Sequence, residues 1–391
     1  MNPIIDPLQL REHYSCFRVK DRTLLTGHSH QAWPDLVQDA YRESFEDAAR
    51  EVDHKWSRAF DQAQRVREGY RGLLDHLDGD ITLAANTHEL LVRFLSALPW
   101  KTKREIVVTD GEFHTVRRQL LRLQEEGIQI QWVSAFPSDT VGSRLAEKIS
   151  ANTAAVICSS VFFESAQIAG QLELLAEAAR HWDTPLLIDT YHQLNVVPFS
   201  SQGLESAYVM GGGYKYCQLG EGNCFLRSPV DCELRPVITG WFADFESLEG
   251  PQSSRVSYSQ SPGARFAGAT YDPISHYRGA KVFEFFRHHD LTVERLRATS
   301  QRQLRILTEA IDRIPVAPQM LSRDREIPLD RLGGFLALRT PHSALIHQKL
   351  EQKGILTDYR GEFLRLGPAP YVSDDQLEQA VATLTTILNS F

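Results

Sequence analysis

The sequence predicts an α/β fold, in which a large domain with a mainly parallel sheet between helices is followed by a small α/β domain. The first observation is that short apolar segments alternate with amphipathic segments between residues 81 and 189. Strands that alternate with helices form right-handed crossovers, and the resulting parallel sheet is covered on both faces. The second observation is the length of 391 residues, which exceeds what one hydrophobic core usually supports. We therefore expect residues 51–288 to form the large domain and residues 289–391 the small one, with residues 1–50 contributing to the small domain and the functional site.

Helical patterns open the large domain. After Pro34, which suits the first turn of a helix, apolar residues recur at helical spacing. The segment 59–77 is amphipathic and carries Phe60, Val66 and Leu73 on one face. The segments that follow are expected as strands 81–84, 105–109, 128–133, 154–160 and 186–189, and as helices 90–98, 116–126, 143–150 and 172–181.

The alternating pattern loosens after residue 226. Residues 228–272 are rich in proline, glycine and serine, which predicts a long irregular region that is functional or covers an interface. Helices are expected next, at 274–288 and 291–314. The small domain is then expected as strand 333–338, helix 343–352, strand 363–366 and helix 375–389.

Composition and charge limit the classes of partner. The formal net charge of −8 and the pI of about 6.0 provide no electrostatic basis for binding nucleic acid or an anionic membrane. The five cysteines are odd in number and form no CxxC pair, a pattern typical of reduced thiols. No apolar stretch approaches the roughly 20 residues that span a bilayer, and the amino terminus lacks an apolar signal core. We expect a cytoplasmic protein that acts on a small molecule.

The stretch from residue 186 to residue 226 carries the candidate chemistry. Its first apolar run ends in Asp189, as a buried parallel strand does when it delivers a carboxylate to the crevice beyond the strand ends. Lys215 stands in a glycine-flanked turn and can reach the same crevice. A carboxylate for a pyridinium nitrogen and a lysine for an aldehyde are the protein groups that a pyridoxal 5′-phosphate site needs. Taken singly, each residue has a plainer interpretation: a carboxylate that caps a loop, and a lysine at the surface.

Two residues ahead of the expected helix 90–98 extend this hypothesis. Asn86 and Thr87 are small polar residues that cap a helix, and the N–H groups of a helix amino terminus also bind phosphate. Other motifs are missing, since the sequence contains no GxxxxGK[ST], no GxGxxG between a strand and a helix, and no GxSxG. His28 and His30 lack a third ligand at a recognisable spacing, so we expect no metal site. Their segment is expected to form a turn over the active site or plain loop structure.

Five sequence blocks follow one another along the chain: IDTYHQLNVVP, GGGYKYCQLGEGNCF, GWF, RFAGATYDPI and TDYRGEFLRLGPAPY. They resemble the corresponding blocks of the kynureninases, which are pyridoxal phosphate enzymes of fold type I and of the class V aminotransferase group. The resemblance extends from about Leu24 to the end of the chain. It implies a large domain with a seven-stranded type of sheet and a homodimer whose subunits share the active site. It also implies hydrolytic cleavage between the β and γ carbons of kynurenine, or of a related amino acid, to give anthranilate and alanine in the first case.

The resemblance further implies roles for individual residues. Lys215 would form an aldimine with the cofactor and move protons at the α carbon of the substrate. Asp189 would pair with the pyridinium nitrogen, and His192 would lie near the phenolic side of the cofactor. The remaining assignments are Phe113 on the ring face, Asn86, Thr87, Tyr214 and Trp241 at the phosphate, Thr270 from a neighbouring subunit, Arg365 at the α-carboxylate of the substrate, and His28 on the substrate side.

Alternatives stay open for several residues and for the reaction. Phe113 and Trp241 could pack in the core, and Arg365 could be half of a structural ion pair. The family usually has a glycine and a histidine after GWF, whereas this chain reads GWFAD, and GHSH replaces the usual NSLG near the amino terminus. Such departures alter the substrate side and spare the cofactor residues, so an aminotransferase or β-lyase on another amino acid is the alternative. A fold relative without catalysis is less favoured, as is a cysteine desulfurase, which would need a cysteine beyond Cys232.

Overall fold

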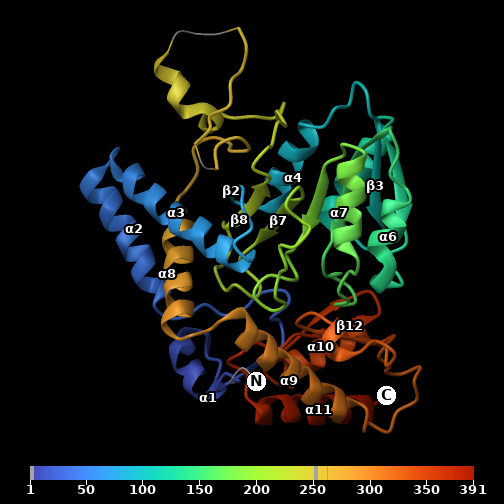
Figure 1. The fold of residues 1–391 in the computed structure, drawn as a ribbon. Helices are drawn as coiled ribbons and strands as arrows, with labels where there is room; N and C mark the ends of the chain where they lie inside the picture. The colour runs from blue at the N-terminus through green and yellow to red at the C-terminus, as the bar shows by residue number, and fades with distance from the viewer. Residues whose placement is uncertain (1–3, 251–253, 262) are drawn as a thin grey trace.

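A seven-stranded sheet forms the centre of the larger part of the molecule (Figure 1). The computed structural model describes residues 4–250, 254–261 and 263–391. The strand order is β2-β8-β7-β6-β5-β3-β4. The strands are β2 (Asp80–Ala84), β3 (Glu105–Thr109), β4 (Gln129–Val133), β5 (Thr153–Ser159), β6 (Leu186–Asp189), β7 (Tyr208–Gly212) and β8 (Cys224–Ser228).

Most neighbouring strands of this sheet are parallel. The pairs β3–β4, β3–β5, β5–β6 and β6–β7 are parallel, and β8 runs antiparallel to both β2 and β7. The prediction of a mainly parallel α/β sheet is therefore confirmed. Neither β7 nor β8 is among the strands expected from the sequence. Only residues 213–223 join β7 to β8, too few for a crossover helix, so the two strands pair as a hairpin whose loop carries Lys215.

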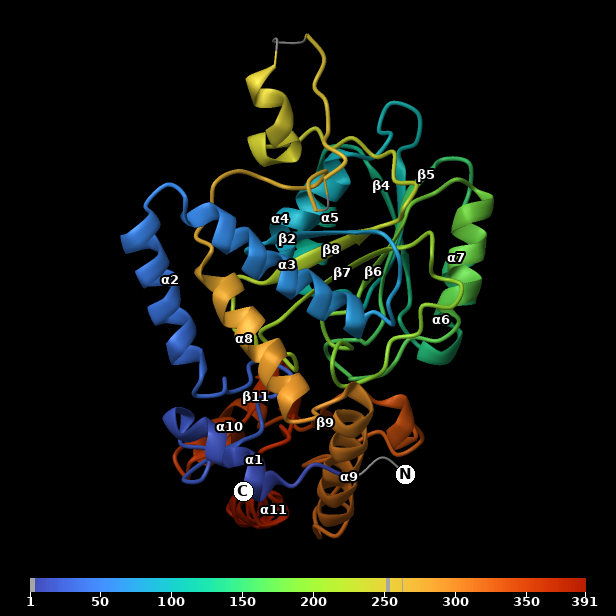
Figure 2. The same cartoon turned by 60° about the vertical axis from the view of Figure 1, so that its left-hand side comes forward.

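Helices cover both faces of the sheet because successive side chains of a strand point in opposite directions. In β3, Val107 belongs to the same core cluster as residues of α6 and α7, whereas Ile106 and Val108 belong to the cluster that includes α4 and α5. Figure 2 shows α6 and α7 together on one side of the sheet. The helices of this part are α2 (Val37–Glu51), α3 (Lys55–Leu73), α4 (Thr87–Ser96), α5 (His114–Glu125), α6 (Val141–Ala146), α7 (Leu172–His181) and α8 (Ile274–His288).

A smaller layer of helices and strands follows α8 (Figure 2). Helices α9 (Val293–Ile311) and α11 (Asp374–Leu388) pack against each other. The strands β11 (Asp358–Arg360), β12 (Phe363–Leu366) and β9 (Leu336–Arg339) form an antiparallel sheet in that order. The further helices are α1 (Pro7–Leu10) and α10 (Ser343–Glu351), with short 3₁₀ helices at Arg11–Phe17, Ser138–Thr140, Trp241–Glu249 and Leu329–Arg331.

The amino-terminal segment contacts both parts of the molecule. Its strand β1 (Thr23–Leu24) pairs in parallel with β10 (Ile355–Leu356) of the smaller layer, while α2 packs against α8. Residues 26–33 lie between these two contacts and beside the hairpin loop, since the Gln31 N–H donates to the Tyr214 carbonyl. The segment that contains His28 and His30 is thereby held next to Lys215. The division into residues 51–288 and 289–391 stays a prediction.

Several element boundaries differ from the expected ones. The helix expected at 90–98 begins at Thr87, because the Asn86 side chain accepts a hydrogen bond from the Glu89 N–H and caps the first turn. The helix expected at 143–150 is the shorter α6. Strands β10 and β11 were not anticipated, since runs of two and three residues are too short to display a period.

Within the irregular region expected at residues 228–272, the described residues include an arm that projects from the body, drawn in yellow in Figure 1. Its one helical piece among the described residues is the 3₁₀ helix Trp241–Glu249. Residues 251–253 and 262 lie outside the described part of the chain. No helix of the described residues is both long and apolar enough to cross a membrane.

Candidate active site

A cavity lies where β5, β6 and β7 end, at the carboxyl edge of the sheet that serves ligand binding in open α/β folds. Asp189 is the last residue of β6, and Ser159, the last residue of β5, is its neighbour in the sheet register. The hairpin after β7 brings Lys215 to the same edge. Six residues predicted from the sequence line this cavity: Thr87, Phe113, Asp189, His192, Tyr214 and Lys215.

Lys215 is buried at the base of the cavity, with 6 % of its surface exposed. Its Nζ lies 2.6 Å from His192 Nε2 and 4.6 Å from the centre of the Tyr191 ring. Burial lowers the pKa of Lys215, and the nearby Asp189 carboxylate opposes that shift. The neutral amine is the form that attacks an aldehyde or accepts a proton, so the surroundings favour the reactive form.

The Asp189 carboxylate is buried and has one uncommitted oxygen. Oδ1 accepts a hydrogen bond of 2.9 Å from the Tyr191 N–H, and no described residue donates to Oδ2. Burial raises the pKa of Asp189, while the Tyr191 N–H and the Lys215 charge act in the opposite direction. A cationic donor such as a pyridinium N–H would pair with this carboxylate and relieve the cost of burying it.

His192 is neutral at ordinary pH, because burial and the Lys215 charge hold its pKa well below the usual value. Its Nδ1 is buried and has no hydrogen-bond partner among the described residues. Phe113 occupies the position before α5 and faces the cavity, with Lys215 Nζ 5.5 Å from its ring centre. An aromatic face beside an orphaned polar nitrogen suits a planar, polar ring as ligand.

The amino terminus of α4 opens onto the cavity. Thr87, its first residue, lines the cavity, and Asn86 caps the helix from an exposed position outside the lining. The free N–H groups and the dipole of a helix amino terminus favour a phosphate there. Tyr214 lies on the cavity wall and stacks against His30, with ring centres 4.6 Å apart and an interplanar angle of 15°. The sequence analysis did not anticipate that stacking contact.

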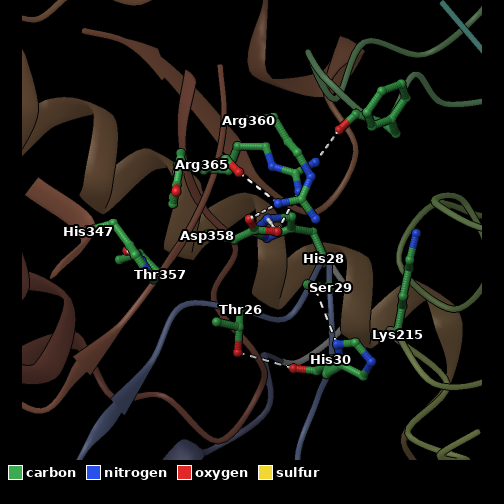
Figure 3. A network of polar contacts seen from close by, with 12 residues as sticks. Thr26, His28, Ser29, His30, Lys215, His347, Thr357, Asp358, Arg360 and Arg365 are labelled. Atoms are coloured by element: carbon green, nitrogen blue, oxygen red, sulfur yellow. Dashed lines mark hydrogen bonds and ion pairs between the residues drawn. The ribbon is translucent and has the colours of Figure 1, made fainter. Parts of the chain in front are cut away.

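Arg365 approaches the site from β12 and is close enough to lower the pKa of Lys215 and His192 through its charge. Its Nη1 donates to the carbonyl of Phe163, a residue that lines the cavity, and its Nη2 pairs with Asp358 at 2.5 Å. Figure 3 shows this ion pair beside His28. Arg365 thus makes a structural ion pair, which is one of its two interpretations from the sequence. It also lies next to the cavity, as the other interpretation, binding of the substrate carboxylate, requires.

Trp241 and Thr270 do not reach the cavity of their own chain. Trp241 belongs to the arm, is 43 % exposed, and packs against Phe242 and Phe245. Thr270 is exposed. Neither residue lines the cavity among the described residues, so assigning Trp241 to the phosphate within one chain has no support in this geometry.

Sequence reasoning missed two acidic residues beside the site. Glu112 is buried and accepts hydrogen bonds from the Thr109 hydroxyl and from the N–H and hydroxyl of Ser159. Asp358 pairs with Arg365 directly across the β11–β12 ladder. Asp358 stands in the TDYRGEFLRLGPAPY block, and its spacing from Arg365 was a usable signal once a hairpin was recognised there.

The residues around the cavity fit pyridoxal phosphate. A buried lysine, a carboxylate with a free oxygen, an aromatic face and a helix amino terminus correspond to the aldehyde, the ring nitrogen, the ring plane and the phosphate. In the described part of the chain, no group of three or more histidine, cysteine, aspartate or glutamate side chains is arranged to hold a metal ion.

Comparisons of sequence point to the same class of protein. Residues 296–384 match the model of the kynureninase C-terminal domain. An uncharacterized aminotransferase, YcbU of Bacillus subtilis (strain 168), is 19 % identical over 380 residues, which cover 96 % of each protein. A kynureninase of Geobacillus thermodenitrificans (strain NG80-2) is 25 % identical over 252 residues, which cover 61 % of this chain and 56 % of the relative.

Solved structures share the whole fold. The cystine C–S lyase C-DES superposes with a TM-score of 0.84 at 16 % identity, covering 96 % of this chain and 98 % of the lyase. The cysteine desulfurase CsdA from Escherichia coli superposes with a TM-score of 0.81 at 15 % identity, covering 100 % of both chains. The chain therefore has the fold of the fold-type I pyridoxal phosphate enzymes and is similar to the class V aminotransferase group, and pyridoxal 5′-phosphate is the cofactor that this fold and the residues of the site indicate.

Proposed function

We propose that the protein is a pyridoxal phosphate enzyme that acts at the β carbon of an α-amino acid. The observation that carries this proposal is the buried group of Lys215, His192 and Asp189 at the carboxyl edge of the sheet, with the Arg365 guanidinium close by. The Arg365 guanidinium can bind the α-carboxylate of an amino acid, and Lys215 can transfer a proton at its α carbon. The proposed substrate is therefore a small amino acid and not a polymer.

Bound pyridoxal phosphate supplies an aldehyde that captures the amino group and a ring that takes up electrons from the α carbon. Lys215 is proposed to take the proton from the α carbon of the substrate and to return it to an atom bonded to that carbon. Its lowered pKa suits a general base near neutral pH. Asp189, whose Oδ2 has no donor among the described residues, would pair with the ring nitrogen and favour its protonated form. His192, which is neutral, holds the Lys215 amine by the 2.6 Å contact.

The remaining residues position ligands. Thr87 and Tyr214 are proposed to hold the phosphate, with Asn86 keeping the start of α4 in place. Phe113 is proposed to cover the ring face. Thr270, which is exposed, is proposed to reach the site of a second subunit in a homodimer, and the exposed Trp241 on the same arm is proposed to approach the phosphate in that way as well.

The leading reaction is kynureninase-type hydrolysis of the bond between the β and γ carbons. Its support is the match of residues 296–384 to the kynureninase C-terminal domain, a region that includes both Arg365 and Asp358. The assay is anthranilate fluorescence after addition of kynurenine or 3-hydroxykynurenine to the cofactor-loaded protein. If no aromatic amine forms from either compound, hydrolysis of these substrates is rejected and the cofactor proposal stands.

The second candidate is a β-lyase or an aminotransferase on another amino acid. It is favoured by the GWFAD sequence, which lacks the family histidine on the substrate side, and by the likeness of the fold to a C–S lyase. A desulfurase that carries sulfur on a cysteine is disfavoured, because no cysteine follows Cys232 and this residue packs against Tyr208 away from the cavity. Release of a keto acid without anthranilate, from a panel of amino acids, would identify this second class.

The absorbance spectrum tests the proposed function as a whole. Protein loaded with pyridoxal phosphate should show an absorbance band near the visible edge that changes when a suitable amino acid is added. Lys215→Ala should abolish the lysine-dependent band, and Lys281→Ala, which removes a surface lysine paired with Glu43, should leave it unchanged. A wild-type protein that stays colourless after exposure to the cofactor would refute the proposal and favour a fold relative without catalysis.

A further inference from the structure

Two nitrogens of the Arg365 guanidinium are already held by groups of the chain itself, whereas its buried Nε has no hydrogen-bond partner among the described residues. Nη1 donates to the Phe163 carbonyl at 2.6 Å, and Nη2 pairs with Asp358 Oδ2 at 2.5 Å. A guanidinium binds a carboxylate through one of two forks, Nη1 with Nη2 or Nε with Nη2. Both forks use Nη2, the nitrogen that Asp358 holds. Because Nη2 has two N–H groups, a substrate carboxylate bound through either fork shares Nη2 with Asp358 and brings a second negative charge next to that carboxylate.

Asp358 has other partners in place. Its Oδ1 accepts a hydrogen bond of 2.7 Å from Arg360 Nη1, and its Oδ2 lies 3.6 Å from His28 Nε2 (Figure 3). Asp358 can therefore release Arg365 and stay paired with Arg360. Two guanidinium groups share this one carboxylate, so one positive charge is left without a carboxylate partner in the cluster. That excess charge favours an anionic ligand.

His28 is the third member of this cluster, and its polar atoms are unsatisfied. The residue is fully buried and stacks on Phe335, with ring centres 4.6 Å apart. Neither ring nitrogen has a hydrogen-bond partner among the described residues. Gly367 makes room for the ring, because a Cβ at that position would lie 2.2 Å from His28 Nδ1. A buried N–H without a partner costs free energy, and a short movement of Asp358 would supply the partner.

We propose that Asp358 changes partners when substrate binds: the α-carboxylate of the amino acid takes Nη2 of Arg365, and the Asp358 carboxylate moves onto the N–H of His28. The inference rests on the proposed function, in which Arg365 binds that carboxylate. His28 carries one N–H because burial lowers its pKa to about 4, so the ring is neutral and donates without adding a charge. Asp358 and His28 are thus specificity-determining residues, which set how strongly the site prefers an amino acid to an amine without a carboxylate.

The test compares L-alanine with ethylamine as ligands of the cofactor-loaded protein, with dissociation constants measured from the change in cofactor absorbance. Asp358→Asn removes the competing charge at nearly constant shape, so the dissociation constant for alanine should fall about tenfold. His28→Leu removes the N–H that receives Asp358, so the same constant should rise about tenfold. Ethylamine, which needs no exchange, should bind equally well in every variant.

Three comparisons make the test specific. His28→Gln, which retains an N–H donor, should restore most of the alanine affinity lost in His28→Leu. In the Asp358→Asn background, His28→Leu should weaken alanine binding less than about threefold, because the two residues act on one exchange. Asp374→Asn, which breaks another Asp–Arg pair with Arg302 outside the site, should change neither constant.

Two results would overturn the exchange. One is weaker alanine binding in Asp358→Asn, which would show that Asp358 only orients Arg365. The other is that His28→Leu changes the dissociation constant for alanine equally in wild type and in Asp358→Asn. An equal change in the dissociation constant for ethylamine would also overturn the exchange. A wild-type protein that stays colourless after exposure to pyridoxal phosphate would instead refute the proposed function, and the exchange with it.

Discussion

Glu112→Gln should remove a pH dependence of stability that the buried Glu112 carboxylate creates beneath the cavity. The side chain is 2 % exposed, and burial raises its pKa to about 7 although Ser159 and Thr109 donate hydrogen bonds to it. Glutamine has the same shape. Its carbonyl oxygen can accept from the Ser159 N–H and the Thr109 hydroxyl, and its amide can donate to the Ser159 hydroxyl.

The sign and size of the effect follow from proton linkage. In the folded protein Glu112 holds its proton up to about pH 7, whereas in the unfolded chain it loses it near the ordinary 4.5. The folded state therefore binds more protons between these values, and stability falls as pH rises from about 4.5 to 7. At about 1.4 kcal/mol per pKa unit, the rise to about 7 corresponds to about 3 kcal/mol lost across this window. The glutamine variant lacks that loss.

The assay is urea unfolding of wild type and Glu112→Gln at pH values from 4.5 to 8. The stability of the variant relative to wild type should increase by about 3 kcal/mol between pH 4.5 and pH 7 and then stay level. Glu147→Gln, which removes an exposed carboxylate, should run parallel to wild type. If the curve of Glu112→Gln were also parallel to wild type, Glu112 would titrate as an ordinary glutamate and the reasoning would be refuted.

Three other substitutions test the packing and capping described above, each measured as the free energy of unfolding in urea. Ser373→Ala removes the capping box that Ser373 and Gln376 form at the start of α11 and should cost about 1 kcal/mol, so a neutral result would contradict the cap. Gly142→Ala places a Cβ 2.0 Å from the Gln171 carbonyl oxygen and should cost at least about 2 kcal/mol, whereas retained stability would mean that the two segments move apart easily. Leu307→Ala empties a fully buried position on α9 and should cost about 2–5 kcal/mol, and a loss below 1 kcal/mol would indicate a loosely packed layer.

Much of the large sheet was predictable because its signals are local. Each parallel strand is a short apolar run between amphipathic segments, and strand ends in such a sheet meet at one edge, which was enough to bring Asp189 and Lys215 together. Strand β8 was not predictable in the same way. Its direction depends on the length of the loop before it and on pairing with β2, a contact far away in the sequence.

The substrate side of the site was less predictable, because its contacts are tertiary. His28 lies near Asp358 because the amino-terminal strand β1 pairs with β10. A strand of two residues is too short to be predicted from a local sequence pattern. The sequence predicts Glu112 as a polar residue in a turn. Its side chain is buried because β5, which carries Ser159, lies next to β3. Trp241 lies on an arm outside the cavity of its own chain, so its assignment to the phosphate stays a prediction that depends on a second subunit.

The two basic side chains of the site, Lys215 and Arg365, are each held by a group of the chain itself. Lys215 Nζ lies 2.6 Å from His192 Nε2, and Arg365 pairs with Asp358, so each basic group has a contact within the chain before any ligand arrives. A buried charge without a partner costs free energy. A group of the chain that pairs with the charge before a ligand binds stabilises the folded protein, but the ligand must displace it and therefore binds less tightly. In the proposed function, Lys215 would leave its contact with His192 to hold the cofactor, and Arg365 would leave Asp358 to bind the carboxylate of the substrate. Selectivity accordingly depends on where the displaced group goes, and for Asp358 the structure offers the His28 ring, whose Nε2 lies 3.6 Å from Asp358 Oδ2 and makes no hydrogen bond.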